Sequence, residues 1–245
     1  MKILVTTIPF GELNPKPLRI MEEAGVEFLI NPLGRKLTED DLYNLIDGFD
    51  VVIAGTESIT ARILEKTNTL KMISRVGIGL DSVDLLTAKK RGIEVCYTPD
   101  APSPAVAELT IALMLSLLRQ VHISNTQMHA GIWHRILGRR LADCTIGIIG
   151  TGRIGKRVIQ HLGGFSVKRI MANDVSAEQV FHGGENVEWC TKRAIYEEAD
   201  IISLHVPLTK NTKNLIGRSE LEIMKNDVLL INTARGGIIN EQQLF

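Results

Sequence analysis

Short apolar runs alternate with amphipathic stretches from the N-terminus to about Tyr97. The apolar runs are rich in branched side chains and lie at residues 2–7, 26–30, 50–55, 70–75 and 93–97. The amphipathic stretches lie between them, at residues 15–25, 38–47 and 60–68. A strand, helix, strand order that repeats in this way predicts a parallel sheet with helices on both of its faces.

A proline-rich stretch then interrupts the alternation. Residues 98–108 read TPDAPSPAVAE, which predicts a stiff linker followed by a helix with Ser103 as its N-cap and Pro104 at its first position. The helix continues through residues 105–119 and is apolar nearly all round, so we expect it to be buried between two bodies. The linker divides the chain into a first lobe at residues 1–99 and a second lobe at residues 100–245.

The alternation resumes after a polar segment at residues 120–140. Further strand-like runs lie at residues 144–150, 168–174, 187–190, 199–206 and 227–234. We therefore predict an α/β protein with two doubly wound lobes, each built on a parallel sheet.

Composition and charge narrow the function classes. Apolar residues make up 44% of the chain, and 28 basic side chains balance 28 acidic ones, so charge favours neither nucleic acid nor an anionic membrane as a partner. The longest apolar run, Leu109 to Leu118, is about half the length of a bilayer span. The N-terminus lacks a signal-peptide layout, and three widely spaced cysteines predict free, buried thiols in a reducing cytoplasm.

A glycine motif marks a candidate nucleotide site. Gly150, Gly152 and Gly155 form G-x-G-x-x-G between a predicted strand and a predicted helix. In that context the glycines allow a tight turn, close approach of a pyrophosphate to the backbone, and close packing of helix on strand. Phosphate oxygens would then bind the N–H groups at the start of the helix.

An acidic residue ends the next predicted strand. Asp174 can accept hydrogen bonds from both hydroxyls of an adenosine ribose and would repel a 2′-phosphate. The following residues, Val175 and Ser176, supply no cation, so the sequence predicts NAD rather than NADP. The alternative is a glycine turn that serves packing alone, with Asp174 as a helix cap.

Four sequence blocks match a known family. They are SRVGIGLDSVDL at 74–85, SPAVAELTIALMLSLLR at 103–119, TIGIIGTGRIGK at 145–156, and the stretch from HVPLT to EQQL at 205–244. In these blocks the chain resembles the D-2-hydroxyacid dehydrogenases, which include D-3-phosphoglycerate, glycerate, D-lactate and formate dehydrogenases. The resemblance covers almost the whole chain. It implies a flavodoxin-like substrate-binding lobe at 1–99, a Rossmann NAD-binding lobe at 100–245, an active site in the cleft between them, and a homodimer formed through the segment 120–140.

The resemblance also implies how a 2-hydroxy or 2-oxo acid is held. Backbone N–H groups of Val76, Gly77 and Ile78 would bind its carboxylate, since consecutive N–H groups can form an anion-binding nest; taken alone, these residues predict only a plain turn. Arg75 lies beside this loop and can meet a phosphate, as in phosphoglycerate-type members. Arg235 matches the catalytic arginine, whose planar fork can bind the carboxylate and carbonyl of the substrate.

The implied NAD contacts extend beyond the glycine motif. The residues implied are Gly150, Gly152, Arg153, Ile154, Gly155, Asp174, His205, Val206, Pro207, Thr212, Thr233, Ala234 and Arg235. His205 belongs to a motif beside the adenine that gives main-chain and packing contacts, so we do not expect it to act as an acid or base. The other five histidines have no metal-like spacing, and we expect no metal.

The family's chemistry also requires a histidine that exchanges a proton with the substrate oxygen and a glutamate that raises the pKa of this histidine. In the family both follow the arginine, and we expect them beyond Phe245, which would leave the second lobe incomplete. The alternatives are an NAD-binding pseudoenzyme without turnover and a remnant that cannot fold alone. The sequence leaves open which hydroxy acid is used and whether a regulatory domain follows.

Overall fold

The computed structural model describes residues 1–175 and 186–244. It divides into two compact units, Met1–Pro102 and Ser103–Phe245. The boundary falls within the predicted proline-rich linker, a few residues after the predicted lobe boundary at 99.

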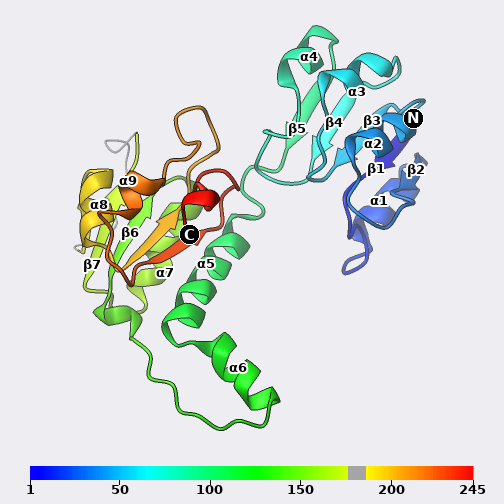
Figure 1. Ribbon diagram of the computed structural model, residues 1–245. Coiled ribbons are helices and arrows are strands. Elements are labelled where there is room, and N and C mark those ends of the chain that lie inside the picture. The colour runs from blue at the N-terminus through cyan, green and yellow to red at the C-terminus, as the bar shows by residue number, and fades with distance from the viewer. Residues whose placement is uncertain (176–185, 245) are drawn as a thin grey trace. The chain divides into compact units, whose positions relative to one another are not determined.

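The first unit is built on a five-stranded parallel sheet with the order β2-β1-β3-β4-β5 (Figure 1). Its strands, in chain order, are β1 (Lys2–Val5), β2 (Glu27–Ile30), β3 (Val51–Ala54), β4 (Met72–Arg75) and β5 (Glu94–Tyr97). This is the flavodoxin-like order, in which the switch point lies between the first and third strands. All five strands predicted for this half of the chain are confirmed.

Helices cover both faces of this sheet. They are α1 (Lys16–Glu23), α2 (Glu39–Leu45), α3 (Ala61–Lys66) and α4 (Leu85–Lys90). Met21 of α1 packs with Ile3 and Val5 on one face, and a larger cluster that includes Leu42 and Leu64 lies on the other. The split follows from the two-residue period of β1, which points Leu4 and its neighbours to opposite faces.

The second unit is built on another five-stranded parallel sheet, with the order β10-β9-β6-β7-β8. Its strands are β6 (Thr145–Ile149), β7 (Arg169–Asn173), β8 (Val187–Trp189), β9 (Ile201–Leu204) and β10 (Leu229–Asn232). With β6 as the first strand, the order is that of a Rossmann sheet, and the switch point lies between β6 and β9. The predicted α/β class with two doubly wound parallel sheets is confirmed.

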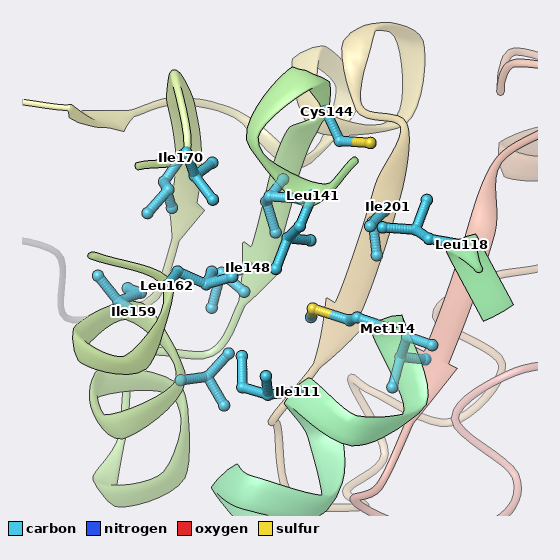
Figure 2. Close-up of a cluster of buried hydrophobic side chains, with 14 of the residues drawn as sticks. Ile111, Met114, Leu118, Leu141, Cys144, Ile148, Ile159, Leu162, Ile170 and Ile201 are labelled. Atoms are coloured by element: carbon cyan, nitrogen blue, oxygen red, sulfur yellow. The ribbon is translucent and has the colours of Figure 1, made fainter. Parts of the chain in front are cut away.

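Two long helices bury one face of this sheet. Figure 2 shows Ile111 and Met114 of α5 (Ser103–Leu118) near Leu162 of α7 (Arg153–Gly163) and Ile148 of β6. The opposite face is covered by α8 (Lys192–Glu198) and α9 (Arg218–Leu221). The remaining elements are α6 (Val121–His129) and two 3-10 turns, η1 (Leu141–Asp143) and η2 (Glu241–Gln243).

The start of α5 differs from the prediction. Ser103 is the first helical residue, and its buried hydroxyl has no hydrogen-bond partner, so the prediction of Ser103 as N-cap is wrong. The helix begins one position earlier than predicted, with Pro104 as its second residue, where the missing N–H of proline costs no helical hydrogen bond. Within the second unit, α5 is buried on one face only, and Leu109 and Leu113 on the other face are exposed.

The three cysteines are free. Cys144 is buried as predicted, whereas Cys96 and Cys190 are half-buried because each lies on or beside an edge strand of its sheet. Over the described ranges no single helix is long and apolar enough to cross a bilayer. Taken together, α5 and α6 would be long and apolar enough, but the pair is bent by 65°.

Candidate functional site

The glycine motif forms a tight loop at the carboxyl end of β6. Gly150 has φ +95°, a region that favours glycine, and a Cβ there would lie 2.6 Å from the carbonyl oxygen of His205. A Cβ on Gly155 would lie 2.0 Å from the carbonyl oxygen of Gly150. Both positions therefore require glycine, and the loop packs directly against the first turn of α7.

The loop also leaves space on its outer side. Gly152 is the N-cap of α7, and nothing lies within 4 Å of the Cβ position on this residue. Arg153 and Ile154 follow in the first turn, where backbone N–H groups have no partner within the helix. This helix of 11 residues therefore presents free donors and the positive end of its dipole beside an open glycine.

Asp174 lies directly after β7, the strand beside β6. One of its carboxylate oxygens, Oδ2, accepts hydrogen bonds from Thr151 in the glycine loop, at 2.6 Å from the backbone nitrogen and 3.1 Å from the hydroxyl. The carboxylate is thus held against the loop that would bind the pyrophosphate. Val175 is fully exposed and carries no charge, while Ser176 lies outside the described residues.

His205 follows β9 and is half-buried. Its Nε2 lies 2.9 Å from the hydroxyl of Ser203, and burial lowers the pKa of this histidine to about 4. The imidazole is therefore neutral at physiological pH and has no acidic proton to give as an imidazolium. Its backbone carbonyl packs on Gly150, so the main chain at this position takes part in shaping the loop.

The segment after His205 is fixed by its own hydrogen bonds. A Cβ on Gly150 would also meet Val206, at 3.0 Å. The hydroxyl of Thr212 donates to the carbonyl oxygen of Pro207 at 2.5 Å and accepts from the backbone nitrogen of Thr209 at 2.7 Å. The predicted cofactor residues Val206, Pro207 and Thr212 therefore belong to one ordered loop beside the glycine motif.

Arg235 lies in the loop after β10. It is half-buried, and its Nη1 donates to the carbonyl oxygen of Ala234 at 2.8 Å. The hydroxyl of Thr233 lies 3.0 Å from that of Thr110 on α5. Because β6, β7, β9 and β10 are parallel, the residues predicted to bind the cofactor all lie at the carboxyl edge of one sheet, where open α/β sheets bind ligands.

The predicted substrate loop lies in the first unit, after β4. Val76 N–H donates to the carbonyl oxygen of Ala54 at 2.9 Å, and Gly77 N–H donates to the hydroxyl of Thr98 at 2.8 Å. Two of the three predicted nest donors are thus bonded within the protein, and Ile78, the third, is half-buried. A ligand carboxylate would have to replace the hydroxyl of Thr98 at Gly77.

Arg75 is 7% exposed and lies beneath this same loop. Its guanidinium donates to the carbonyl oxygen of Val76, and a Cβ on Gly77 would lie 2.9 Å from its Nη1. Gly77 has φ +139°, so its glycine identity serves both the backbone conformation and the packing of Arg75. The guanidinium therefore shapes the predicted nest from below.

Four residues that hold these loops in place were not predicted from the sequence. They are Thr98, Thr110, Thr151 and Asn232. Asn232 carried a local signal, because an asparagine two residues before a backbone N–H at a strand end favours an Asx turn. The three threonines carried no such signal, since the residues that they hold at the site, Gly77, Thr233 and Asp174, come from other elements.

Comparisons with known proteins agree with this arrangement. Residues 111–245 match the family model "D-isomer specific 2-hydroxyacid dehydrogenase, NAD binding domain". A hydroxypyruvate reductase of Thermotoga maritima is 38% identical over 212 residues, which cover 85% of this chain and 68% of the relative. A D-3-phosphoglycerate dehydrogenase of Methanocaldococcus jannaschii is 36% identical over 252 aligned residues, which cover 100% of this chain and 46% of the relative.

Solved structures give the same result. The TT0316 protein of Thermus thermophilus matches with a TM-score of 0.89 and 32% identity, covering 100% of this chain and 77% of that one. An NAD-dependent formate dehydrogenase of Staphylococcus aureus, in complex with NAD, matches with a TM-score of 0.84 and 29% identity over 100% of this chain and 76% of that one. The chain thus spans about two thirds of the first relative and under half of the second. It belongs to the D-isomer specific 2-hydroxyacid dehydrogenase family and carries that family's NAD-binding domain.

Proposed function

We propose that the protein is an NAD-dependent oxidoreductase that acts on the CH–OH group of a D-2-hydroxy acid and, in reverse, reduces the corresponding 2-oxo acid. The observation that carries the proposal is the gathering of the glycine loop, Asp174 and Arg235 at one edge of the second sheet. Relatives named as hydroxypyruvate reductase, glyoxylate reductase and D-3-phosphoglycerate dehydrogenase support the substrate class.

The residues of the second unit fit NAD. The cradle at Gly150 and Gly155 has no room for a side chain, and Gly152 opens towards the start of α7, as a bound pyrophosphate requires. Asp174 binds the adenosine ribose through its carboxylate, and the loop from His205 to Pro207 lines the adenine side. When bound, NAD supplies the hydride acceptor for the reaction.

Arg235 holds the substrate. Its guanidinium carries a permanent charge and a planar set of donors, which bind the substrate carboxylate and the carbonyl oxygen together. This contact orients the reacting carbon and stabilises the negative charge that develops on the oxygen during reduction. In the predicted nest, Ile78 and, once the hydroxyl of Thr98 has been displaced, Gly77 are the proposed further donors to a substrate carboxylate, whereas the N–H of Val76 is bonded to Ala54.

Arg75 contributes to the substrate site through the loop that it supports. Because its guanidinium packs beneath Val76 and Gly77, its charge reinforces an anion nest from behind. A substrate phosphate would have to draw the side chain out of this position. This geometry favours small, unphosphorylated 2-oxo acids over phosphoglycerate-type substrates.

The segment 120–140 is proposed as the surface through which two copies associate. It exposes apolar side chains at Val121, Met128, Ile132, Trp133 and Leu137, and exposed apolar groups gathered in one segment are typical of an interaction site. Sedimentation of Trp133→Ser should show monomers where the unchanged protein sedimented as dimers.

We propose the cytoplasm as the location of the protein, in keeping with three cysteines that form no disulfide.

A second candidate function is cofactor binding without turnover. It is favoured because the cofactor site rests on the glycine loop and Asp174, neither of which exchanges a proton with the substrate, so NAD can bind without turnover. Binding of NADH that depends on Asp174, without oxidation by any 2-oxo acid, would support this candidate.

The test is the rate of NADH oxidation with glyoxylate, hydroxypyruvate and phosphohydroxypyruvate. Arg235→Ala should lower kcat/KM by about 10²–10³-fold, since a fixed donor to the developing oxyanion is removed. Arg235→Lys should recover part of the loss, because it keeps the charge but not the fork. Arg218→Ala, at an exposed arginine of α9, is the matched control. Equal rates in Arg235→Ala and the unchanged protein would remove Arg235 from the mechanism.

A further inference from the structure

Asn232 is the last residue of β10 and uses both ends of its carboxamide on the loop that carries Arg235. Its Oδ1 accepts a hydrogen bond from the backbone nitrogen of Ala234 at 3.1 Å, and its Nδ2 donates to the carbonyl oxygen of Arg235 at 2.8 Å. These partners fix the orientation of the amide, since a backbone N–H can only donate and a carbonyl oxygen can only accept. The side chain is exposed, so it contributes little to the hydrophobic core.

Thr233, the next residue, is held by α5. The hydroxyl of Thr110 donates its one hydrogen to the carbonyl oxygen of Val106 at 2.8 Å. In the 3.0 Å contact between Thr110 and Thr233, the donor is therefore Thr233. Thr110 is fully buried in the core, which makes it a fixed anchor for the side chain of Thr233.

The backbone of Arg235 is thus held on its N-terminal side, where the chain comes from β10. On its other side follow Gly236, with open space around its Cβ position, and Gly237, with φ +78°. Two glycines impose little conformational restriction of their own. The backbone position from which the Arg235 side chain starts is therefore fixed by residues 232–234 and their two anchors.

We propose that Asn232 is a positioning residue for Arg235. The proposal rests on the proposed function, in which Arg235 binds the substrate through a planar pair of donors. Such bidentate binding requires a defined direction of the guanidinium, and small errors in placement lower the rate of reaction strongly. Neither Asn232 nor Thr110 belongs to the residues proposed to contact cofactor or substrate.

The two hydrogen bonds from the Asn232 side chain to Ala234 and Arg235, here called the clamp, require an asparagine. Alanine at this position would remove both hydrogen bonds. Aspartate would keep the acceptor for Ala234 but would place a second oxygen against the carbonyl oxygen of Arg235, which repels it. Both Asn232→Ala and Asn232→Asp should therefore release the arginine loop, while the fold is retained because the side chain is exposed.

The test compares the unchanged protein, Asn232→Ala, Asn232→Asp and the control Asn44→Ala, at an exposed asparagine of α2. The first readout is the rate at which phenylglyoxal modifies Arg235 in the ligand-free protein, followed by peptide mass spectrometry. The second is the affinity of the NADH-loaded protein for oxamate, a 2-oxo acid analogue, followed by NADH fluorescence. We expect a changed modification rate and about tenfold weaker oxamate binding in both Asn232 variants, because binding must then order the released arginine loop.

NADH affinity should fall less than oxamate affinity, since residues 233–235 are only one part of the proposed cofactor site, and Asn44→Ala should match the unchanged protein in every readout. An unchanged modification rate at Arg235 in either Asn232 variant would overturn the clamp. If the unchanged protein binds NADH but not oxamate, the proposed function fails, whereas the modification rate of Arg235 still decides on Asn232.

Discussion

At the scale of single residues, Asp174 determines which nicotinamide cofactor fits. Asp174→Asn keeps an oxygen that can accept from Thr151 (2.6 Å to its backbone nitrogen) but removes the charge that repels a 2′-phosphate. We expect NADH to bind about tenfold more weakly, because hydrogen bonds to a charged group are lost, and NADPH to bind more tightly than before. Fluorescence titration with both cofactors measures this. An unchanged ratio of the two dissociation constants would contradict the role of Asp174.

The lowered pKa of His205 predicts how the free energy of unfolding depends on pH. Burial lowers its pKa to about 4, below the value of about 6.5 for an unfolded chain. The unfolded state therefore binds more protons between these two values, and the free energy of unfolding should fall as the pH falls from 6.5 to 4, by at most about 1.4 kcal/mol per pH unit from this group. Urea unfolding at several pH values measures the slope.

The matched variant is His205→Gln, which can keep a hydrogen bond to Ser203 but does not titrate in this range. Its free energy of unfolding should depend less on pH between 4 and 6.5. If the two proteins show the same slope, His205 is protonated as easily when folded as when unfolded.

At the scale of elements, alanine substitutions at two glycines of α7 should have opposite effects on stability. A Cβ at Gly155 would lie 2.0 Å from the carbonyl oxygen of Gly150, whereas a Cβ at Gly163 meets nothing within 4 Å. Gly155→Ala should destabilise the second unit by about 1–3 kcal/mol through overpacking and weaken NADH binding, because helix and loop must separate.

Gly163→Ala should leave NADH binding unchanged and raise stability by up to about 1 kcal/mol, since alanine favours the helix. Thermal melting and NADH titration of both variants give the comparison. Equal behaviour of the two alanine variants would mean that the glycine loop does not need the close packing seen here.

At the scale of the whole molecule, the core is divided between the two units. Each buried hydrophobic cluster among the described residues draws its side chains from one unit only. We therefore expect two unfolding transitions in calorimetry, of which NAD raises only that of the second unit, because a ligand stabilises the unit that binds it.

Substitution of one buried leucine in each unit shows which unfolding transition belongs to which unit. Leu64 in α3 and Leu162 in α7 are both fully buried, and alanine at either should cost about 2–5 kcal/mol. Leu64→Ala should lower one melting temperature and Leu162→Ala the other. A single transition that both variants and NAD shift alike would show that the two units unfold together.

Much of the fold could be predicted because it depends on local rules. The ten strands follow from short apolar runs of branched residues, and their parallel order follows from the helices between them. The glycine loop was predictable because the geometry of a strand, tight turn and helix admits only glycine at Gly150 and Gly155. The start of α5 was misplaced, since helix boundaries depend on contacts that a sequence pattern does not contain.

The sequence alone determined the α/β architecture, the nucleotide loop, the acidic residue after β7 and the arginine after β10. Only the tertiary structure decided what holds these residues in place. The Thr110 and Thr233 hydroxyls lie 123 positions apart in the chain, and Gly77 meets Thr98 across two strands of its sheet. A threonine in an apolar helix looks the same in sequence whether or not its hydroxyl has a distant partner, because a hydrogen bond between distant residues exists only once the chain has folded.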